Sequence, residues 1–439
     1  MSIRKLATTD FTYYLVGFDQ NGRERPQNDG SLLSRAVLEE ISGHLVTDVF
    51  LMSHGWRGDG PAAVRQYDAW MENLMNAVQD IEEMKRLRQR FRPLLVGWHW
   101  PSEPFGNESA DSFAVGEEDS VAALVEDYMQ RLGNEPGIRD ELQTIIRAHM
   151  TTDDPPSLPL EVANAYHRLE QKLGLGQGGE AGAPGTDRPA FDPEDVFQAA
   201  RQEDSQSGGE IGSFGGFSFG NLLAPLRVLS FFKMKDRARK FGESGAHTML
   251  NEIREAAADS NVRIHLMGHS FGCIVVSAAA AGPPSTTNTA KVASMVLVQG
   301  ALSLWGYCPD VPFLQGKPGY FNRILKQQNV TGPIVTTQSE FDSAVGTFYP
   351  IAAGLKNQIA FGEALPKFGG IGTFGIQGLD ATGRGMAGVA EKYEFEPGKI
   401  YNLESSKIIK SGGPPSGAHS DISHPEVAHV IWEAAMAAN

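Results

Sequence analysis

The serine best placed to attack a substrate is Ser270, in the run Gly268-His269-Ser270-Phe271-Gly272, which fits the pattern G-x-S-x-G. The pattern alone is weakly specific, because Gly216-Phe217-Ser218-Phe219-Gly220 fits it as well. Only the first run follows an apolar stretch, Val262–Met267, and opens a helical one, Phe271–Ala281. That order predicts a strand, a sharp turn and a helix, which is the context in which such a serine acts as a nucleophile.

A tight turn between a strand and a helix explains the chemistry expected of Ser270. The turn holds the Oγ exposed at the tip of the strand, and Gly268 and Gly272 are needed because a Cβ there would collide with the adjoining backbone. The N-terminus of the helix directs backbone N–H groups at the negative oxygen that forms when a carbonyl is attacked. The alternative is a buried serine in a glycine-rich turn.

On this motif the chain resembles the α/β-hydrolase superfamily, over most of its length outside a central insertion. In that family a His-Gly pair after an earlier strand supplies a second oxyanion donor. Here His54-Gly55-Trp56 comes after the apolar run Val49–Met52. The resemblance therefore implies the backbone N–H groups of Trp56 and Phe271 as the two donors, and the alternative for His54 is a simple turn with a histidine cap.

The family places its acid after a later strand and its histidine near the C-terminus, in the order Ser, Asp or Glu, His. Asp342 follows the apolar run Pro333–Thr337 and precedes small residues, so it is the expected acid that orients the imidazole. Glu340 is close enough to compete for this role. Either carboxylate can instead be a surface group with no role.

The tail offers His419, His424 and His429 as candidates for the general base. Their spacing does not place them on one helix face, and no H-E-x-x-H motif occurs, so we expect no zinc site. His419 lies in the loop where the family keeps its histidine and is the expected base. His424 precedes a helix, whose positive end disfavours an imidazolium, and His429 lies inside that helix. Asp421 is expected to cap the helix or, as an alternative, to orient His419.

The composition narrows the classes of partner. The 439 residues include 38 Lys and Arg against 53 Asp and Glu, and the net charge of −15 repels phosphate backbones and anionic lipid. Cys273 and Cys308 can form one disulfide at most, and Cys273 is expected to pack rather than react. The N-terminus lacks the apolar stretch of a signal peptide, and glycines and prolines interrupt the uncharged run 264–290. We expect a soluble, cytoplasmic protein that binds no nucleic acid and has no integral membrane segment.

Short apolar runs alternate with helical patterns, which predicts an α/β fold with a mostly parallel sheet and helices on both faces. The expected strands are Phe11–Phe18, Thr47–Met52, Pro93–His99, Val262–Met267, Val292–Gln299, Pro333–Thr337 and Ile400–Leu403. The expected helices are Ser31–Ile41, Ala62–Arg88, Phe271–Ala281 and Pro425–Ala438. Trp98, His99 and Trp100 end a strand beside the expected site, where packing is the default role and pocket lining the second.

A central insertion, residues 102–235, separates the two parts of the expected hydrolase core, residues 1–101 and 236–439. It contains four helical patterns, at Val121–Arg131, Arg139–His149, Leu160–Leu173 and Asp192–Arg201. Glycine-rich tracts at 174–185 and 208–220 suggest flexible joints. A more specific hypothesis, compatible with the first, is a mobile cap whose apolar side chains face the substrate, namely Phe214, Phe217, Phe219, Leu222, Leu223 and Phe231. The stretch Gly369–Gly388 is expected as a further loop over the same face.

Together these features predict a serine hydrolase that acts on carboxylic esters through an acyl-enzyme, with Ser270, His419 and Asp342 as its triad and no cofactor or metal. The expected substrate is a small-molecule or lipid-like ester, and amide hydrolysis and acyl transfer, which use the same triad, stay open as alternatives. The apolar segment Phe214–Phe231 leaves open a lipase-like or toxin-type lipolytic enzyme. A catalytically silent binding module with the same fold is the alternative from another class, and the sequence gives no indication of oligomeric state.

Overall fold

The computed structural model describes residues 2–56, 60–102, 117–152, 155–175, 182–206, 222–286, 291–343, 365–413 and 417–438. The strands are β1 (Ser2–Lys5), β2 (Thr12–Gly17), β3 (Asp48–Ser53), β4 (Pro93–His99), β5 (Arg263–His269), β6 (Ser294–Val298), β7 (Ile334–Gln338), β8 (Thr382–Gly385) and β9 (Ile400–Glu404). The helices are α1 (Leu33–Ser42), α2 (Gly60–Asn76), α3 (Val78–Leu87), α4 (Glu117–Leu132), α5 (Ile138–Thr151), α6 (Leu160–Leu173), α7 (Pro193–Gln206), α8 (Ala224–Phe241), α9 (His247–Ala256), α10 (Gly272–Ala281), α11 (Asn322–Lys326), α13 (Ile371–Phe374) and α14 (Pro425–Met436), with a π turn η2 (Gly242–Ala246) and a 3-10 turn η3 (Gly417–Ser420).

In the described part of the chain the strands form one nine-stranded sheet, in the order β1-β2-β4-β3-β5-β6-β7-β9-β8. β1 is antiparallel to β2 at one edge, and the other neighbouring strands in this sheet pair in parallel. The predicted α/β class and mostly parallel sheet are therefore confirmed. Because the pairing is parallel, the carboxyl ends of β3, β5, β6 and β7 meet at one edge, where Ser53 is in register with Gly268 and His269 with Val298.

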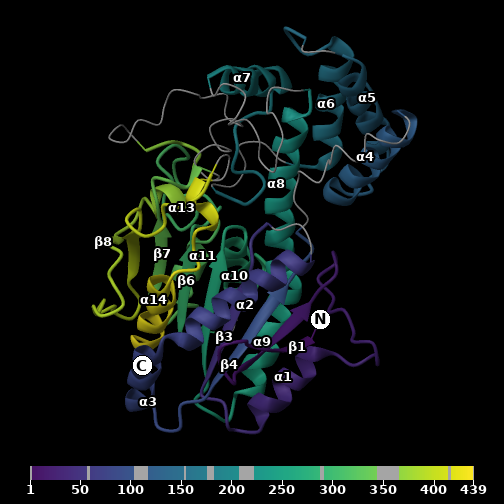
Figure 1. The fold of residues 1–439 in the computed structure, drawn as a ribbon. Helices are drawn as coiled ribbons and strands as arrows, with labels where there is room; N and C mark the ends of the chain where they lie inside the picture. The colour runs from purple at the N-terminus through teal and green to yellow at the C-terminus, as the bar shows by residue number, and fades with distance from the viewer. Residues whose placement is uncertain are drawn as a thin grey trace.

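Alternate residues of the strands belong to two apolar clusters. In β3, Val49 and Leu51 lie in the cluster that includes side chains of α1, α9 and α10. Phe50 and Met52 lie in the cluster that includes side chains of α2, α3 and α14. Because successive side chains of a strand point to opposite faces, this division places helices on both faces of the sheet (Figure 1).

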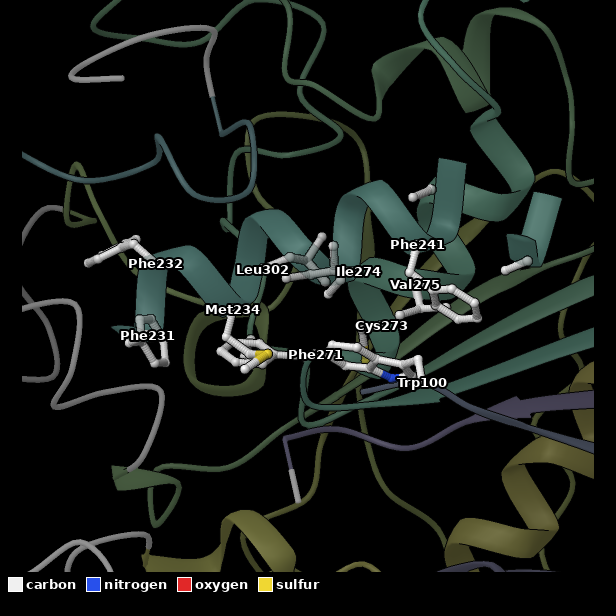
Figure 2. Close-up of a cluster of buried hydrophobic side chains, with 14 of the residues drawn as sticks. Trp100, Phe231, Phe232, Met234, Phe241, Phe271, Cys273, Ile274, Val275 and Leu302 are labelled. Atoms are coloured by element: carbon white, nitrogen blue, oxygen red, sulfur yellow. The ribbon is translucent and has the colours of Figure 1, made fainter. Parts of the chain in front are cut away.

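Helix α10 is buried along its whole length, from Gly272 to Ala281. Its small residues allow close packing, since a Cβ on Gly242 in η2 would lie 2.5 Å from the Cβ of Ala278. Figure 2 shows the apolar cluster between α8 and α10, in which Phe231 lies beside Phe271 with their ring centroids 5.1 Å apart. Packing on the sheet and on α8 therefore fixes the start of α10, where the motif serine is found.

The described helices of the expected insertion, α4 to α7, gather at one end of the molecule, and α8 runs from them to the sheet (Figure 1). Their buried side chains share one apolar cluster with α10 and the sheet. Buried ion pairs join Lys235 of α8 to Asp187, and Arg188 to Glu170 at 2.7 Å. The expected boundary at residue 235 falls inside α8, which continues through η2 into α9 without a break.

Some elements differ from the sequence prediction. The helix expected over Ala62–Arg88 is two helices, α2 and α3, because the backbone leaves the helical region at Ala77, with ψ of 66°. The stretch Gly369–Gly388, expected as a loop, contains α13 and β8. Strand β8 has the exposed sequence Thr-Gly-Arg-Gly, so no alternation of apolar residues predicts it. Among the described helices, none is both long and apolar enough to cross a membrane.

Candidate active site

Ser270 lies in the sharp turn between β5 and α10. Its φ of 57° is a left-handed value that is uncommon for residues other than glycine. The Ser270 N–H donates to the Val298 carbonyl at 3.1 Å, and its carbonyl accepts from the Ala301 N–H at 3.2 Å. Hydrogen bonds to the end of β6 and to the residues just after it therefore hold this strained turn in place.

Both glycines of the motif are required by space. A Cβ on Gly268 would lie 2.5 Å from the carbonyl carbon of Gly272. A Cβ on Gly272 would lie 2.0 Å from the carbonyl oxygen of Ser53 in the neighbouring strand β3. The two glycines expected from the motif are therefore required, because any side chain at either position would collide with adjoining backbone and force the turn apart.

His419 brings its imidazole to this turn from the C-terminal part of the chain. It lies in η3, and its Nε2 is 2.7 Å from the Ser270 Oγ. The turn is fixed from two sides, because the Ala418 N–H donates to the Phe341 carbonyl at 2.8 Å and the His269 Nε2 lies 2.8 Å from the His419 carbonyl oxygen. The imidazole therefore faces the serine hydroxyl from a backbone with little freedom to move.

Asp342 lies on the far side of the imidazole. Its Oδ2 and Oδ1 are 2.9 Å and 3.1 Å from the His419 Nδ1, and the residue is 1% exposed. The loop after β7 that carries Asp342 packs closely on η3, since a Cβ on Gly417 would lie 2.2 Å from the Phe341 carbonyl oxygen. The three side chains predicted from the sequence thus form one continuous chain of contacts.

The residues considered as alternatives to Asp342 and His419 make other contacts. Glu340 is exposed, and the structure gives it a backbone contact, from its N–H to the Ser406 Oγ at 3.0 Å. The His424 Nε2 lies 2.8 Å from the Asp421 Oδ1. The α14 N-terminus has no side-chain capping hydrogen bond, so the capping role expected for Asp421 is wrong, and the histidine that its carboxylate contacts is His424. Its other carboxylate oxygen accepts the N–H groups of Lys410 and Ser411, so it secures the chain that leads to η3.

The exposure expected for Ser270 is wrong. Ser270 is only 5% exposed and His419 only 9% exposed. The physical reason is the close approach of the chain after β3, because a Cβ on Gly55 would lie 2.5 Å from the Ser270 Cβ and 3.0 Å from its Oγ. The backbone at Gly55 therefore covers one side of the serine while the imidazole occupies another.

The same approach places Trp56 and Phe271, the residues expected to donate to an oxyanion, beside each other. Their rings stack with centroids 5.6 Å apart, and the ring centroids of Phe231 and Trp56 are 6.0 Å apart. The Phe271 N–H makes no hydrogen bond to an acceptor among the described residues. His54, in the same turn, is fully buried and its ring stacks on that of Trp100 with the centroids 5.8 Å apart, so packing holds this turn in place.

Neighbouring residues agree with the packing roles expected for them. Trp98 and Trp100 are fully buried, and the Trp100 Nε1 donates to the His54 carbonyl at 3.1 Å. Cys273 is fully buried, its Sγ donates to the Gly268 carbonyl at 3.1 Å, and burial raises the pKa of the thiol well above its usual value. Cys273 and Cys308 are both free, so the chain forms no internal disulfide.

Part of the cap hypothesis falls on residues outside the described ranges: Phe214, Phe217, Phe219 and the second motif match at 216–220. Leu222, Leu223 and Phe231 are described, and all three are buried in the apolar cluster that includes α8 and α10. Of these, Phe231 is the one whose ring contacts the aromatic pair next to Ser270.

Two functional candidates were missed by sequence reasoning. His269 precedes the serine and contacts both the His419 carbonyl and, from its Nδ1, the Gln66 amide nitrogen at 3.2 Å. Gln299 follows β6, and its Nε2 lies 2.9 Å from the Asp342 Oδ2. In the sequence, the only indication of a role for Gln299 is that it ends the predicted strand Val292–Gln299, which comes after the predicted strand that leads to Ser270.

One group of described residues has the composition of a metal site. The donor atoms of Asp80, His429 and Glu433 all lie within 4.8 Å of one another. The His429 Nδ1 is 2.8 Å from the Asp80 Oδ1, and its Nε2 is 2.7 Å from the Glu391 carbonyl oxygen. Both ring nitrogens therefore face acceptors, which an imidazolium satisfies with its two N–H groups.

Comparisons with protein-family models, curated proteins and solved structures found no match for this chain.

Proposed function

We propose that this protein is a serine hydrolase that cleaves carboxylic esters through an acyl-enzyme intermediate. The observation that carries the proposal is the position of His419, whose Nε2 is 2.7 Å from the Ser270 Oγ and whose Nδ1 is 2.9 Å from the Asp342 Oδ2. Nucleophile, base and orienting carboxylate within hydrogen-bond distance of one another are the arrangement that activates a serine.

In the proposed reaction the Ser270 Oγ attacks the ester carbonyl carbon while its proton passes to the His419 Nε2. The Nδ1–H of His419 donates to Asp342, which fixes the tautomer and stabilises the imidazolium that forms. The carbonyl oxygen becomes an oxyanion and accepts the N–H groups of Phe271 and Trp56. Collapse of the tetrahedral intermediate breaks the bond to the alcohol oxygen, which takes the proton from His419 and leaves an acyl group on Ser270.

Water completes the cycle by the same steps. His419 takes a proton from the water as the water oxygen attacks the acyl carbon. When the second tetrahedral intermediate collapses, the bond to the Ser270 Oγ breaks, His419 gives that proton to the Oγ, and the carboxylic acid departs. Protein groups supply every proton transfer, so the proposal includes neither a cofactor nor a metal. The mostly parallel sheet, the turn at Ser270 and the order Ser270, Asp342, His419 support the α/β-hydrolase fold as part of this proposal.

The decisive test is covalent labelling with a fluorophosphonate probe followed by mass spectrometry. We expect labelling of the parent at Ser270 and none in Ser270→Ala. Equal labelling of Ser270→Ala would show that the nucleophile is another residue. A folded parent that neither labels nor hydrolyses p-nitrophenyl esters would instead favour the catalytically silent binding module.

The aromatic side chains beside Ser270 favour an ester with an apolar acyl chain, which is the lipase-like version of the proposal. Phe231 contacts both Trp56 and Phe271. We expect Phe231→Ala to reduce the ratio of rates on long and short p-nitrophenyl esters. Phe91→Ala is the control, since Phe91 packs on Trp432 in the apolar cluster on the other face. An unchanged ratio in Phe231→Ala would exclude a role for this aromatic group in acyl recognition.

A further inference from the structure

We propose that Gln299 is a positioning residue for the reaction, acting through the carboxylate of Asp342. The Gln299 Nε2 lies 2.9 Å from the Asp342 Oδ2, the oxygen nearer to the His419 Nδ1. Both side chains are almost completely buried, at 0% and 1% exposure. A buried carboxylate needs donors that replace water, and here one donor is the imidazole while another is the Gln299 amide. This inference rests on the proposed function.

The orientation of the Gln299 amide follows from its other contacts. The Gln299 backbone N–H donates to the Thr337 Oγ1 at 3.0 Å, and the Thr337 Oγ1 lies 2.8 Å from the Gln299 Oε1. A hydroxyl has one hydrogen, which Thr337 gives to Oε1. The NH₂ end must therefore point the other way, toward Asp342 and the Gly372 carbonyl at 3.2 Å. A flipped amide would set an oxygen against both acceptors.

The backbone also fixes Gln299 at this place. Its φ of 45° is left-handed, as is the φ of Ser270 in the neighbouring turn. The α13 turn lies close to the Gln299 backbone and to the Asp342 carboxylate, since a Cβ on Gly372 would be 2.8 Å from the Gln299 backbone carbonyl carbon and 2.9 Å from the Asp342 Oδ2. A strained backbone that is held in place by its surroundings is typical of functional sites.

These contacts define what Gln299 does in the reaction. Its N–H group shares the charge of Asp342 with the imidazole and fixes the plane of the carboxylate against the His419 Nδ1. Without the amide, the carboxylate loses a donor that fixes its plane, and more of its charge acts on the imidazolium. We therefore expect slower acylation and an imidazolium that keeps its proton to higher pH.

The test compares kcat, KM and the pH profile for p-nitrophenyl acetate in the parent and in Gln299→Met, which keeps the shape of the side chain and removes the donor. We expect kcat to fall about 10- to 100-fold, the effect of losing a hydrogen bond to a charged group. We expect little change in KM, and we expect the acidic limb of kcat/KM to move to higher pH. The control is Asn322→Leu, which removes a buried amide bonded to the Tyr307 carbonyl and should leave the acidic limb in place.

Gln299→Glu provides a rescue that a purely structural role would not produce. While the new carboxyl is protonated, its O–H can donate to Asp342, so kcat should exceed that of Gln299→Met below neutral pH. In alkaline buffer two carboxylates would face each other, and the advantage should disappear. If Gln299→Met does not fold, Thr337→Val frees the Oε1 end of the amide and should move kcat and the acidic limb in the same direction, by less.

The outcomes separate this inference from the proposed function. A parent that labels at Ser270, with a Gln299→Met variant that keeps the parent kcat and acidic limb, overturns the role of Gln299 alone. Equal pH profiles for Gln299→Met and Gln299→Glu also overturn it. A parent that does not label at Ser270 overturns the proposed function and this inference together.

Discussion

Ser270 and His419 are 149 residues apart in the sequence, and their Oγ and Nε2 atoms are 2.7 Å apart in the structure. The parallel sheet accounts for the serine side of this contact, since β5 ends where β3 and β6 also end. The position of His419 depends on η3, a short turn whose sequence shows no apolar periodicity. Its position comes from hydrogen bonds to Phe341 and His269.

We predict that His419→Gln lowers kcat for a p-nitrophenyl ester by about a million-fold, because triad members act as a unit. The matched control is His424→Gln, which removes the imidazole that pairs with Asp421 and leaves the contact with Ser270 intact. Steady-state kinetics and fluorophosphonate labelling check both variants. If His424→Gln abolished activity and His419→Gln retained it, the base would be assigned to the wrong histidine.

The role proposed for Asp342 as the orienting acid gives a second prediction. Asp342→Asn should lower kcat by about 10,000-fold, because the amide can donate to His419 and favour the wrong tautomer. Glu340→Gln should stay near the parent rate, since Glu340 is exposed. Circular dichroism shows whether both variants fold. A large loss in Glu340→Gln with a normal Asp342→Asn would reverse the choice between the two carboxylates.

Local sequence patterns predict the central elements well because they report on burial. The strands β3, β4 and β6 each contain an apolar run, and the burial of α10 follows from an uncharged sequence. The turn at Ser270 can be predicted from its motif, since a Cβ on Gly268 would collide with Gly272 four residues later, although the collision that requires Gly272 is with Ser53 of the neighbouring strand.

What the sequence does not predict depends on contacts between distant segments. The burial of Ser270 results from the approach of Gly55, more than two hundred residues earlier in the chain. The contact between Gln299 and Asp342 requires that β6 and β7 be neighbours. No periodicity indicates that Asp421 would bind the N–H groups of Lys410 and Ser411.

The approach of Gly55 to Ser270 gives a third prediction. In Gly55→Ala the added Cβ would lie 2.5 Å from the Ser270 Cβ, so the turn or the serine must move. We expect kcat/KM to fall about 100-fold, the effect of a misplacement of roughly 1 Å at the reacting group. Gly383→Ala is the control, because nothing lies within 4 Å of the new Cβ. Equal activities of the two variants would mean that the Gly55 backbone does not constrain the serine.

The buried cysteines give a fourth prediction, which separates serine from cysteine chemistry at this site. Burial raises the pKa of the Cys273 and Cys308 thiols, and only the thiolate reacts with an alkylating agent. Iodoacetamide should therefore leave the native protein unmodified and fully active. In urea both thiols should be alkylated, as mass spectrometry would show. Rapid loss of activity with modification of Cys273 alone would place that thiol in the reaction.

The fifth prediction concerns stability and uses the contact between His429 and Asp80. Burial lowers the pKa of His429, but the Asp80 carboxylate and the Glu391 carbonyl outweigh it, so the pKa stands above its ordinary 6.5. A raised native pKa contributes stability that is fully present below the unfolded pKa and is lost as pH rises through the native pKa. The pair should therefore stabilise the fold most in mildly acidic solution.

Urea unfolding of the parent and of His429→Gln at acidic, neutral and alkaline pH measures this contribution. The difference in unfolding free energy should be largest at acidic pH and shrink as pH rises, by about 1.4 kcal/mol for each unit by which the native pKa exceeds the unfolded one. His167→Gln is the control, because His167 is exposed on α6 and should change stability little at any pH. A difference that grows with pH would contradict the raised pKa and would mean that neutral His429 is the form the native state prefers.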